Sequence, residues 1–377
     1  MWYPSQENPV KGIFVKEHAK AVALYNDVVV FAFSGGSRSL ISLYEADEQI
    51  EDGIRTIRIK HKVLPVSKVS YFVNLWAVFA SFRKLVHDGW RPDVIHAHIY
   101  SAGVPAIILG KMYSLPVVVT EHFTGFPRRL IHGFSRMQAK FAFEWASLVC
   151  PVSEDLKKSI ESYGIRARFK VIPNVVDISL FSLQGSYDGG KTGESKKRIL
   201  LVALLDPKKG IPYLLEALAN LKKKRSDFIL DIVGDGSYRS EYEALARELD
   251  LADMVRFHGL KTKQEVSEFM KRCDFFVLPS LFETFGVVFI EALACGKPVI
   301  GPDIGGPNEI ITTDAGKLVP PANTDALTAA IGYMIDHYKD YSPEKMAQYA
   351  RERFSYMAVG QMLDRVYREV IFKQISL

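Results

Sequence analysis

Residues 278–309 read LPSLFETFGVVFIEALACGKPVIGPDIGGPNE, and this stretch indicates how the chain folds. The apolar residues that end at Leu278 predict a short strand, which a polar loop follows. A helix is predicted between Gly286 and Gly296, since apolar residues fill the interval and glycine commonly ends helices. Residues 298–300 predict the next strand. A strand, a helix and a second strand in this order form the unit of a parallel α/β sheet.

The start of this predicted helix suits an anion. Gly286, Val287 and Val288 carry no acidic side chain, so the free N–H groups and the positive end of the helix dipole would face a phosphate. Glu283 lies in the loop before the helix, and Glu291 lies about one turn inside it, where a carboxylate can hold sugar hydroxyls. Taken singly, each residue also fits a buried strand–helix–strand unit in which the two glutamates are ordinary loop and helix charges.

The whole stretch resembles the signature of glycosyltransferase family 4, a family of retaining enzymes. That signature is Glu-x-Phe-Gly, a second Glu eight residues after the first, Gly-x-Pro-Val, and Gly-Gly-x-x-Glu. Its positions are filled by Glu283, Phe285, Gly286, Glu291, Gly296, Pro298, Val299, Gly305, Gly306 and Glu309. The resemblance implies an α/β protein of GT-B architecture, with two Rossmann-like doubly wound domains facing a central cleft and a C-terminal helix crossing back to the first domain.

A chain of 377 residues suggests two domains. Strands and helices alternate on both sides of a polar segment, QGSYDGGKTGESKK, which marks the boundary. We expect an acceptor-side domain over residues 1–183, a linker over 184–197, a nucleotide-sugar-binding domain over 198–357, and a helix over 358–377 that packs back on the first domain.

Charge and composition limit where the protein can be located and which partners it can bind. No signal peptide is recognised, and no apolar run reaches the roughly 18 residues of a membrane span, so a cytoplasmic protein is expected. Residues 1–175 hold 22 Lys and Arg against 15 Asp and Glu, a net +7, whereas the remainder has 26 against 28, a net −2. A basic half can make a peripheral contact with an anionic membrane at its inner face. Chance asymmetry of a solvated surface is the alternative.

Other partners are not indicated. The basic residues lack interleaved aromatic residues or a reader motif, so nucleic acid is not expected as a partner. Cys150, Cys273 and Cys295 are too widely separated for a disulfide framework or a zinc site. His96 and His98 lack a third metal ligand, and no Asp-x-Asp pair occurs, so we expect no metal and no cofactor beyond the donor itself.

In the first half, strands are predicted over residues 28–33 and 54–59, and a helix over 71–87. The apolar face of that helix is expected to run through Phe72, Leu75, Phe79, Phe82 and Val86. Trp2-Tyr3-Pro4-Ser5 has the composition of a loop that follows a strand, and in the resembling family an apolar strand precedes such a loop. We therefore expect either a strand ahead of Met1 or a sheet with one strand fewer.

Lys209 and His122 are further candidate site residues. Lys209 lies between a strand end and a helix start, where it can hold a diphosphate. The resembling family has Arg five residues earlier, but Leu204 stands here, so Lys208 or the helix amides would have to compensate. His122 follows a strand end, and the resemblance implies that it lies near the reacting sugar carbon. Of the two histidines in DVIHAH, His98 is expected to line the cleft, and His96 to be part of the core.

The resemblance also implies roles for the remaining residues. Glu283 would lie nearest the transferred sugar and form the catalytic pair with His122. Glu291 would bind the ribose, and Phe285, Gly286, Val287 and Val288 would complete the donor site. The backbone near Leu260 would meet the base. Gly12 would lie against donor and acceptor, although it also fits an ordinary turn.

These features predict a metal-independent glycosyltransferase that moves a sugar from a nucleotide-diphosphate sugar to a glycan or lipid-linked acceptor with retention of configuration. A role in surface polysaccharide or glycoconjugate biosynthesis is expected. A degenerate, non-catalytic sugar-nucleotide-binding protein is one alternative, which Leu204 favours; Lys209, Glu283 and Glu291 argue against it. A sugar-nucleotide epimerase of similar fold is the other alternative.

Overall fold

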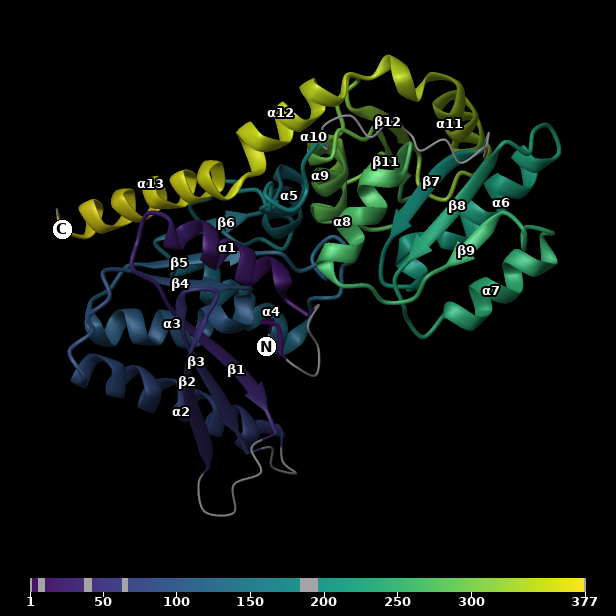
Figure 1. Ribbon diagram of the computed structural model, residues 1–377. Helices are drawn as coiled ribbons and strands as arrows, with labels where there is room; N and C mark the ends of the chain where they lie inside the picture. The colour runs from purple at the N-terminus through teal and green to yellow at the C-terminus, as the bar shows by residue number, and fades with distance from the viewer. Residues whose placement is uncertain (1, 6–10, 37–42, 63–66, 184–195, 376–377) are drawn as a thin grey trace. The chain divides into compact units, whose positions relative to one another are not determined.

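The computed structural model describes residues 2–5, 11–36, 43–62, 67–183 and 196–375 (Figure 1). Contacts divide the chain into two compact units. Unit 1 comprises residues 1–152, 156–175 and 356–377, and unit 2 comprises residues 153–155 and 176–355. Residues 184–195 of the predicted linker lie outside the described residues.

In the described part of unit 1, the strands form two three-stranded sheets. The first has the order β1-β3-β2, with β1 (Val29–Gly35) parallel to β3 (Ile54–His61) and β2 (Tyr44–Glu51) antiparallel to it. The second is parallel and has the order β4-β5-β6, formed by Ile95–His98, Val117–Glu121 and Leu148–Pro151. The helices are α1 (Ile13–Ala23), α2 (Ser67–His87), α3 (Tyr100–Tyr113), α4 (Gly133–Glu144), α5 (Glu154–Glu161) and α13 (Tyr356–Ile375).

Three features of unit 1 differ from the sequence-based expectation. Strand β2 was not predicted, because its sequence YEADEQIE has no apolar alternation; ion pairs such as Arg58–Glu51, at 2.6 Å, join it to β3. Helix α3 was not predicted either, and Pro105 lies inside it. The predicted apolar face of α2 is wrong at Phe72, which is 66% exposed, whereas its neighbour Val73 is buried. The buried face of α2 is therefore shifted by about one residue relative to the predicted face, because the elements packed against the helix decide which side is buried.

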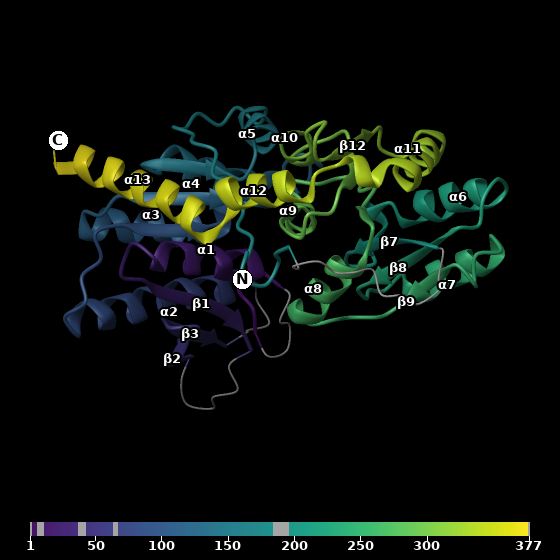
Figure 2. The same cartoon turned by 45° about the horizontal axis from the view of Figure 1, so that its top comes forward.

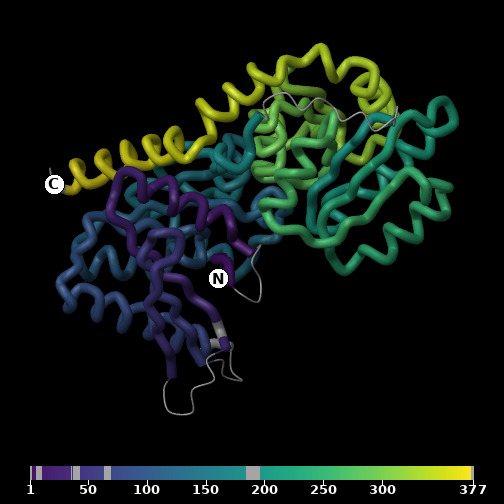
Figure 3. The backbone as a smooth tube through the Cα atoms, viewed as in Figure 1, coloured from purple at the N-terminus to yellow at the C-terminus, as the bar shows by residue number. Residues whose placement is uncertain are grey.

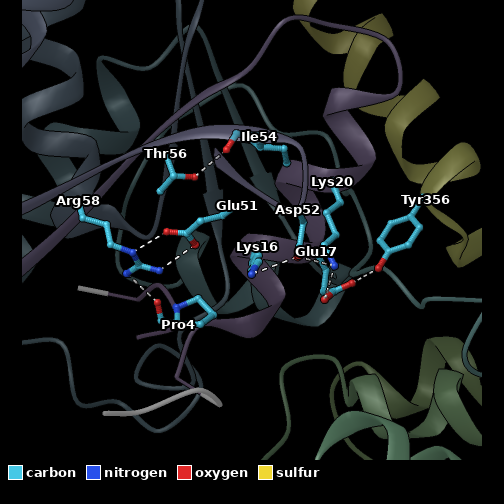
Figure 4. Close-up of polar contacts among 10 residues, drawn as sticks. All are labelled: Pro4, Lys16, Glu17, Lys20, Glu51, Asp52, Ile54, Thr56, Arg58 and Tyr356. Carbon is cyan, nitrogen blue, oxygen red and sulfur yellow. Dashed lines mark hydrogen bonds and ion pairs between the residues drawn. The ribbon is translucent and has the colours of Figure 1, made fainter. Parts of the chain in front are cut away.

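Helix α13 completes the core of unit 1. Val359, Leu363 and Val366 pack with Leu148 of β6 in one buried cluster. The Tyr356 hydroxyl donates a hydrogen bond to the Glu17 carboxylate of α1 (Figure 4). The purple N-terminal helix and the yellow C-terminal helix, far apart in sequence, therefore lie side by side (Figures 2 and 3).

The described residues of unit 2 form one six-stranded parallel sheet with the order β12-β11-β10-β7-β8-β9. Its strands are β7 (Lys197–Val202), β8 (Phe228–Val233), β9 (Val255–Phe257), β10 (Phe275–Val277), β11 (Val299–Pro302) and β12 (Gly316–Val319). Its helices are α6 (Ile211–Lys222), α7 (Arg239–Glu248), α8 (Lys263–Arg272), α9 (Val287–Ala294), α10 (Pro307–Ile310), α11 (Thr324–His337) and α12 (Pro343–Phe354), with short 3₁₀ turns at Pro207–Lys209 and Tyr338–Asp340. Every residue of β8 is buried, as expected of a strand covered on both faces. Among the described residues, no helix is both long enough and apolar enough to cross a membrane.

Candidate functional site

The loop before α9 leaves the start of that helix accessible. Gly286 has a φ of 86°, and a Cβ atom at this position would lie 2.5 Å from the ring of Phe289, so only glycine fits. The first turn of α9, which the structure describes in full, carries no acidic side chain. Val287 and Val288 are partly exposed, whereas the rest of α9 is buried. The free N–H groups at this helix start are therefore available to an anion.

Lys209 and Glu283 form an ion pair next to this helix start. The Lys209 Nζ atom lies 2.7 Å from Oε2 of Glu283, and their side chains are 17% and 11% exposed. The 3₁₀ turn that carries Lys209 is capped by Asp206, whose carboxylate accepts the Lys208 N–H at 3.0 Å. The structure thus brings together the predicted diphosphate-binding cation and the predicted sugar-binding carboxylate.

A glycine holds the two loops of this ion pair in contact. Gly210 has a φ of 68°, and a Cβ atom there would lie only 2.0 Å from the carbonyl oxygen of Pro279. The Leu281 N–H also donates to the Lys208 carbonyl oxygen at 2.7 Å. The backbones of the two loops are therefore in direct contact. This contact fixes the separation of the Lys209 and Glu283 side chains.

Glu291 lies in the buried helix α9, between Ile290 and Ala292, and is 7% exposed. A carboxylate is costly in such surroundings unless polar groups or a ligand compensate it. The structure places Glu291 on the helix that begins after Gly286.

Two glycines of the signature support the loop that carries Glu283. A Cβ atom on Gly305 would lie 2.0 Å from the Glu283 carbonyl oxygen, and one on Gly306 would lie 2.3 Å from the Phe285 Cα atom. Both positions therefore require glycine because the backbones of the two loops touch. The sequence predicted a turn here but not this contact.

The last signature residue, Glu309, forms structural hydrogen bonds that were not predicted from the sequence. Its carboxylate accepts hydrogen bonds from the N–H groups of Glu154 and Asp155, at 3.0 and 3.1 Å, at the start of α5. These two residues and Ser153 group with unit 2, and the Ser153 hydroxyl donates to the Thr284 carbonyl oxygen at 2.7 Å. An acidic side chain at a helix start is favourable for the helix dipole. The structure thus anchors the loop around Thr284 at a second point.

Two predicted positions of unit 2 are exposed. Leu204 follows β7, where the resembling family has Arg, and its side chain is exposed. Leu260 follows Gly259 after β9, and its side chain is also exposed.

His122 of unit 1 is buried in a group of aromatic rings. Its Nε2 atom lies 3.0 Å from Nδ1 of His98, and its ring centroid lies 4.3 Å from that of Phe14. Burial lowers the pKa of His122 well below 6.5, and the neighbouring His18 and His96 lower the pKa further. His122 is therefore neutral at physiological pH, and so can exchange hydrogen bonds without carrying charge.

His96 has a different environment from His98. Its Nδ1 atom lies 2.6 Å from the Tyr367 hydroxyl, and its Nε2 atom lies 2.7 Å from the Thr120 hydroxyl. Burial lowers its pKa to about 3. Both ring nitrogens of His96 are thus engaged within unit 1, whereas His98 is the residue in contact with His122.

Glu121 is a buried residue whose importance the sequence did not indicate. Its carboxylate accepts the backbone N–H groups of Tyr100, His122 and Phe123 at 2.7 to 2.9 Å. Burial raises its pKa to about 7, against the opposing effect of these hydrogen bonds. Glu121 therefore fixes the backbone that carries His122. Its place at the end of a strand, directly before a candidate histidine, was the only signal available.

Gly12 precedes α1 with a φ of 72°. A Cβ atom at Gly12 would lie 2.3 Å from the backbone carbon of Trp2, so the N-terminal segment requires glycine here. The structure accounts for Gly12 by this contact. Among the described residues, no three His, Cys, Asp or Glu side chains converge on a metal position.

Comparison with known proteins identifies the class. A family model described as Glycosyltransferase Family 4 matches residues 14–180, and one described as Glycosyl transferases group 1 matches residues 189–353. Glycogen synthase of Mycobacterium tuberculosis is 29% identical over 300 residues, which cover 76% of this chain and 71% of that protein.

Solved structures share the fold. Sucrose-phosphate synthase from Thermosynechococcus elongatus superposes with a TM-score of 0.79 at 23% identity, covering 96% of this chain and 94% of that one. Anabaena HepE, solved with UDP and glucose, gives 0.75 at 23% identity, covering 95% of each chain. These matches confirm the predicted GT-B fold of a glycosyltransferase. Glycosyltransferase family models thus match two adjoining stretches that together span most of the chain, which is a glycosyltransferase with the GT-B fold.

Proposed function

We propose that this chain transfers a sugar from a nucleotide-diphosphate sugar to a glycan or lipid-linked acceptor, with retention of configuration, in surface polysaccharide or glycoconjugate biosynthesis. One observation carries the proposal: Lys209 and Glu283 place opposite charges 2.7 Å apart beside an accessible helix start. A sugar diphosphate needs a cation and N–H donors at its phosphates and an acceptor for its hydroxyls, all within a few bonds of each other.

The proposed donor roles follow the chemistry of each group. Lys209 and the N–H groups of Val287 and Val288 bind the diphosphate, and Glu283 accepts hydrogen bonds from the sugar hydroxyls. Glu291 holds the ribose, and the backbone near Leu260 meets the base. The structures of HepE with UDP and with UDP-glucose support a donor of this kind.

The proposed mechanism keeps the anomeric configuration without a protein nucleophile. Retaining hydrolases use two carboxylates about 5–5.5 Å apart across the bond. Here Glu283 is paired with Lys209, and Glu291 is assigned to the ribose. The acceptor oxygen attacks the anomeric carbon on the face that the diphosphate leaves, and its proton passes to the departing phosphate oxygen. Neutral His122 and Gly12 are proposed to lie near the reacting sugar.

Product analysis tests this reaction. We expect transfer to proceed in EDTA, because Lys209 and the helix amides stabilise the leaving diphosphate, and we expect NMR to show the donor's anomeric configuration in the product. An inverted anomer would exclude the retaining class, and loss of transfer in EDTA would exclude the metal-independent diphosphate site. Donor binding without transfer would support the non-catalytic alternative, and a new sugar nucleotide formed without acceptor would support the epimerase.

A peripheral membrane contact is proposed for unit 1. Phe134 and Met137 of α4 are 63% and 69% exposed. The Phe134 ring lies 6.2 Å from that of Tyr71, so the exposed aromatic residues of α2 adjoin this face. Exposed basic residues lie on α4 and in the segment before it: Arg128, Arg129, Arg136 and Lys140. Exposed aromatic and basic side chains in one segment are typical of interfacial helices, and each basic residue contributes about 1 kcal/mol at an anionic surface.

Liposome flotation tests the contact. We expect the protein to float with phosphatidylglycerol vesicles at low salt and to be released at high salt, because salt screens the attraction. Phe134→Ser with Met137→Ser should reduce flotation, and Leu24→Ser, at another exposed apolar residue, should leave it unchanged. Retention of the double variant at wild-type level would exclude this face and favour a soluble glycan acceptor.

A further inference from the structure

A cavity lies within unit 1, between the β2–β3 ladder and the C-terminal half of α2, which packs against both strands (Figure 1). Its volume is about 310 Å³, at the lower end of the roughly 300–1,000 Å³ that is typical of small-ligand pockets. We call this cavity the α2 pocket. Its lining includes two residues from each of the three elements: Ala46 and Glu48 of β2, Arg55 and Ile57 of β3, and Ser81 and Lys84 of α2.

The periodicity of the strands and of the helix brings these side chains together. Alternate residues of a strand point to one face, so Ala46 and Glu48 lie on the same side of the ladder as Ile57, the pairing partner of Glu48. Ser81 and Lys84 are three residues apart and so lie on one face of α2. Ala46 carries only a methyl group and therefore leaves room that a longer side chain would fill.

The charged groups at the α2 pocket are balanced. The Arg55 guanidinium donates to both carboxylate oxygens of Glu48, at 2.6 and 3.1 Å. These hydrogen bonds lower the pKa of Glu48, and the Lys84 ammonium lowers it further. The same bonds raise the pKa of Arg55, and the carboxylate of Asp88, which also lines the pocket, raises it further. Two cations and two anions thus act on one another, and their charges sum to zero.

Ser81 contributes a hydroxyl group that lacks a partner. The residue is 5% exposed, and no group among the described residues forms a hydrogen bond with its Oγ atom. A buried hydroxyl normally has a partner, because its removal from water costs free energy. Ile57 and Leu85, which also line the pocket, are buried and form its apolar part. A ligand with hydroxyl groups would supply the missing partner of Ser81.

We propose that the α2 pocket binds one neutral sugar residue. Sugar hydroxyls both donate and accept hydrogen bonds, so they can bind carboxylates, a guanidinium, an ammonium group and a serine hydroxyl together. The C–H groups of the sugar ring would pack against Ile57 and Leu85. Because the four charges of the pocket sum to zero, neither an anionic nor a cationic ligand is attracted overall.

This site is additional to the candidate reaction site. The described residues that line the α2 pocket include neither Lys209 and Glu283 nor the rings that surround His122. Sugar binding at the α2 pocket therefore does not require the transfer reaction, and its failure would leave the proposed function untouched.

Methyl NMR of the full chain tests the site. The probes are the methyl glycosides of glucose, galactose and mannose, and the comparison ligands are glucuronic acid, glucosamine and glutamine. We expect at least one glycoside to shift the methyl resonances of Ile57 and Leu85 saturably, to leave Ile229 of β8 unchanged, and to bind more tightly than the charged ligands. The absence of a saturable shift, or equal or tighter binding of a charged ligand, would overturn the proposal.

Two substitutions with matched controls locate the bound sugar. Ala46→Leu fills the pocket, and Gln49→Leu places the same side chain on the opposite face of β2. Lys84→Met removes a hydrogen-bond donor, and Arg83→Met removes an exposed neighbouring charge that does not line the pocket. We expect the first variant of each pair to weaken glycoside binding at least tenfold and the second to leave it unchanged. Wild-type affinity in Ala46→Leu, or equal losses within a pair, would overturn the proposal.

Ser81→Ala separates ligand binding from a structural role of the hydroxyl. We expect this variant to bind the glycoside at least threefold more weakly and to keep or exceed the wild-type melting temperature, because no hydrogen bond within the described chain is lost. A lower melting temperature together with unchanged binding would show that the hydroxyl serves the fold, which would contradict the proposal.

Discussion

The Lys209–Glu283 pair combines two properties that a donor site needs. Its side chains are mostly shielded from water, so the attraction is screened less than in a surface ion pair. The pair is not enclosed, however, and a diphosphate can compete with Glu283 for the ammonium group. Lys209 would then exchange one anionic partner for another when a donor binds, and the Glu283 carboxylate would be released to the sugar hydroxyls.

Donor affinity tests this exchange. We expect Lys209→Ala and Glu291→Ala each to lose a charge-assisted hydrogen bond worth roughly 1.5–3 kcal/mol, which corresponds to about a 10- to 150-fold weaker Kd in calorimetric titration. Lys222→Ala is the matched control, because the Lys222 ammonium lies 2.9 Å from Asp250 rather than against Glu283. Wild-type affinity in both the Lys209 and Glu291 variants would contradict the proposed donor site.

The buried histidines make unit 1 sensitive to acid. Burial lowers the pKa of His18 to about 4, from 6.5, and the pKa values of His96, His98 and His122 are also lowered. Between pH 4 and 6.5 the unfolded chain therefore binds more protons than the folded one at these sites, so their contribution to stability is lost as the pH falls. Glu121 acts in the opposite direction, because its raised pKa makes the folded state bind the extra proton between pH 4.5 and 7.

Chemical denaturation at several pH values between 7 and 5 measures the net number of protons that unfolding takes up. We expect unfolding to take up protons near pH 5.5, because the four buried histidines gain protons and Glu121 releases one. His18→Gln should lower this uptake by about one proton, whatever it does to the stability at neutral pH. Equal pH dependence in wild type and His18→Gln would show that His18 does not titrate as its burial implies.

At the scale of the secondary-structure elements, close backbone contacts position the α9 loop. Gly305 follows β11 and touches the backbone of Glu283, while Gly210 precedes α6 and touches Pro279. Neither contact would survive an added methyl group without a backbone shift. The loop between β10 and α9 is therefore positioned by its neighbours as much as by its own sequence.

Two alanine substitutions separate contact from backbone strain. Gly305 and Gly133 have φ values of 54° and 48°, but a Cβ atom at Gly133 would meet nothing within 4 Å. Gly133→Ala should cost about 1 kcal/mol of stability, from the left-handed backbone alone. Gly305→Ala should cost more in thermal denaturation and should also weaken donor binding, because Glu283 must move. Similar losses in both variants would indicate that strain, not contact, explains Gly305.

At the scale of the whole molecule, the chain returns to unit 1 after completing unit 2. Residues 356–377 group with unit 1, and α13 buries Val359 and Leu363 against β6 and α1. Each unit has its own core, so damage to one need not unfold the other.

Truncation after Ser355 tests this independence. We expect hydrogen exchange to speed up in β5 and β6, which lose the α13 cover, while β8 of unit 2 keeps its protection. A chain that ends at residue 371 retains the α13 core positions and is the matched control. Equal loss of protection in β6 and β8 would show that the two units unfold together.

Much of the fold could be predicted from local pattern. The helix after Gly286 and strand β1 lie close to their predicted ranges, because apolar runs and glycines mark their ends. Strand β2 could not be predicted, since its exposed charged residues are paired only through β3. The face of α2 was misplaced at Phe72, because periodicity does not reveal which neighbouring elements cover a helix.

The sequence by itself determined the class of protein and singled out Lys209, Glu283 and Glu291 as candidate site residues, because a signature of specific residues at specific spacings carries that information. Only the tertiary structure decided how these residues meet. The 2.7 Å contact of Lys209 with Glu283 joins positions 74 residues apart, and the carboxylate of Glu309 reaches the start of α5 across 155 residues. Such contacts depend on packing between distant segments, whereas sequence patterns report the local preferences of each segment.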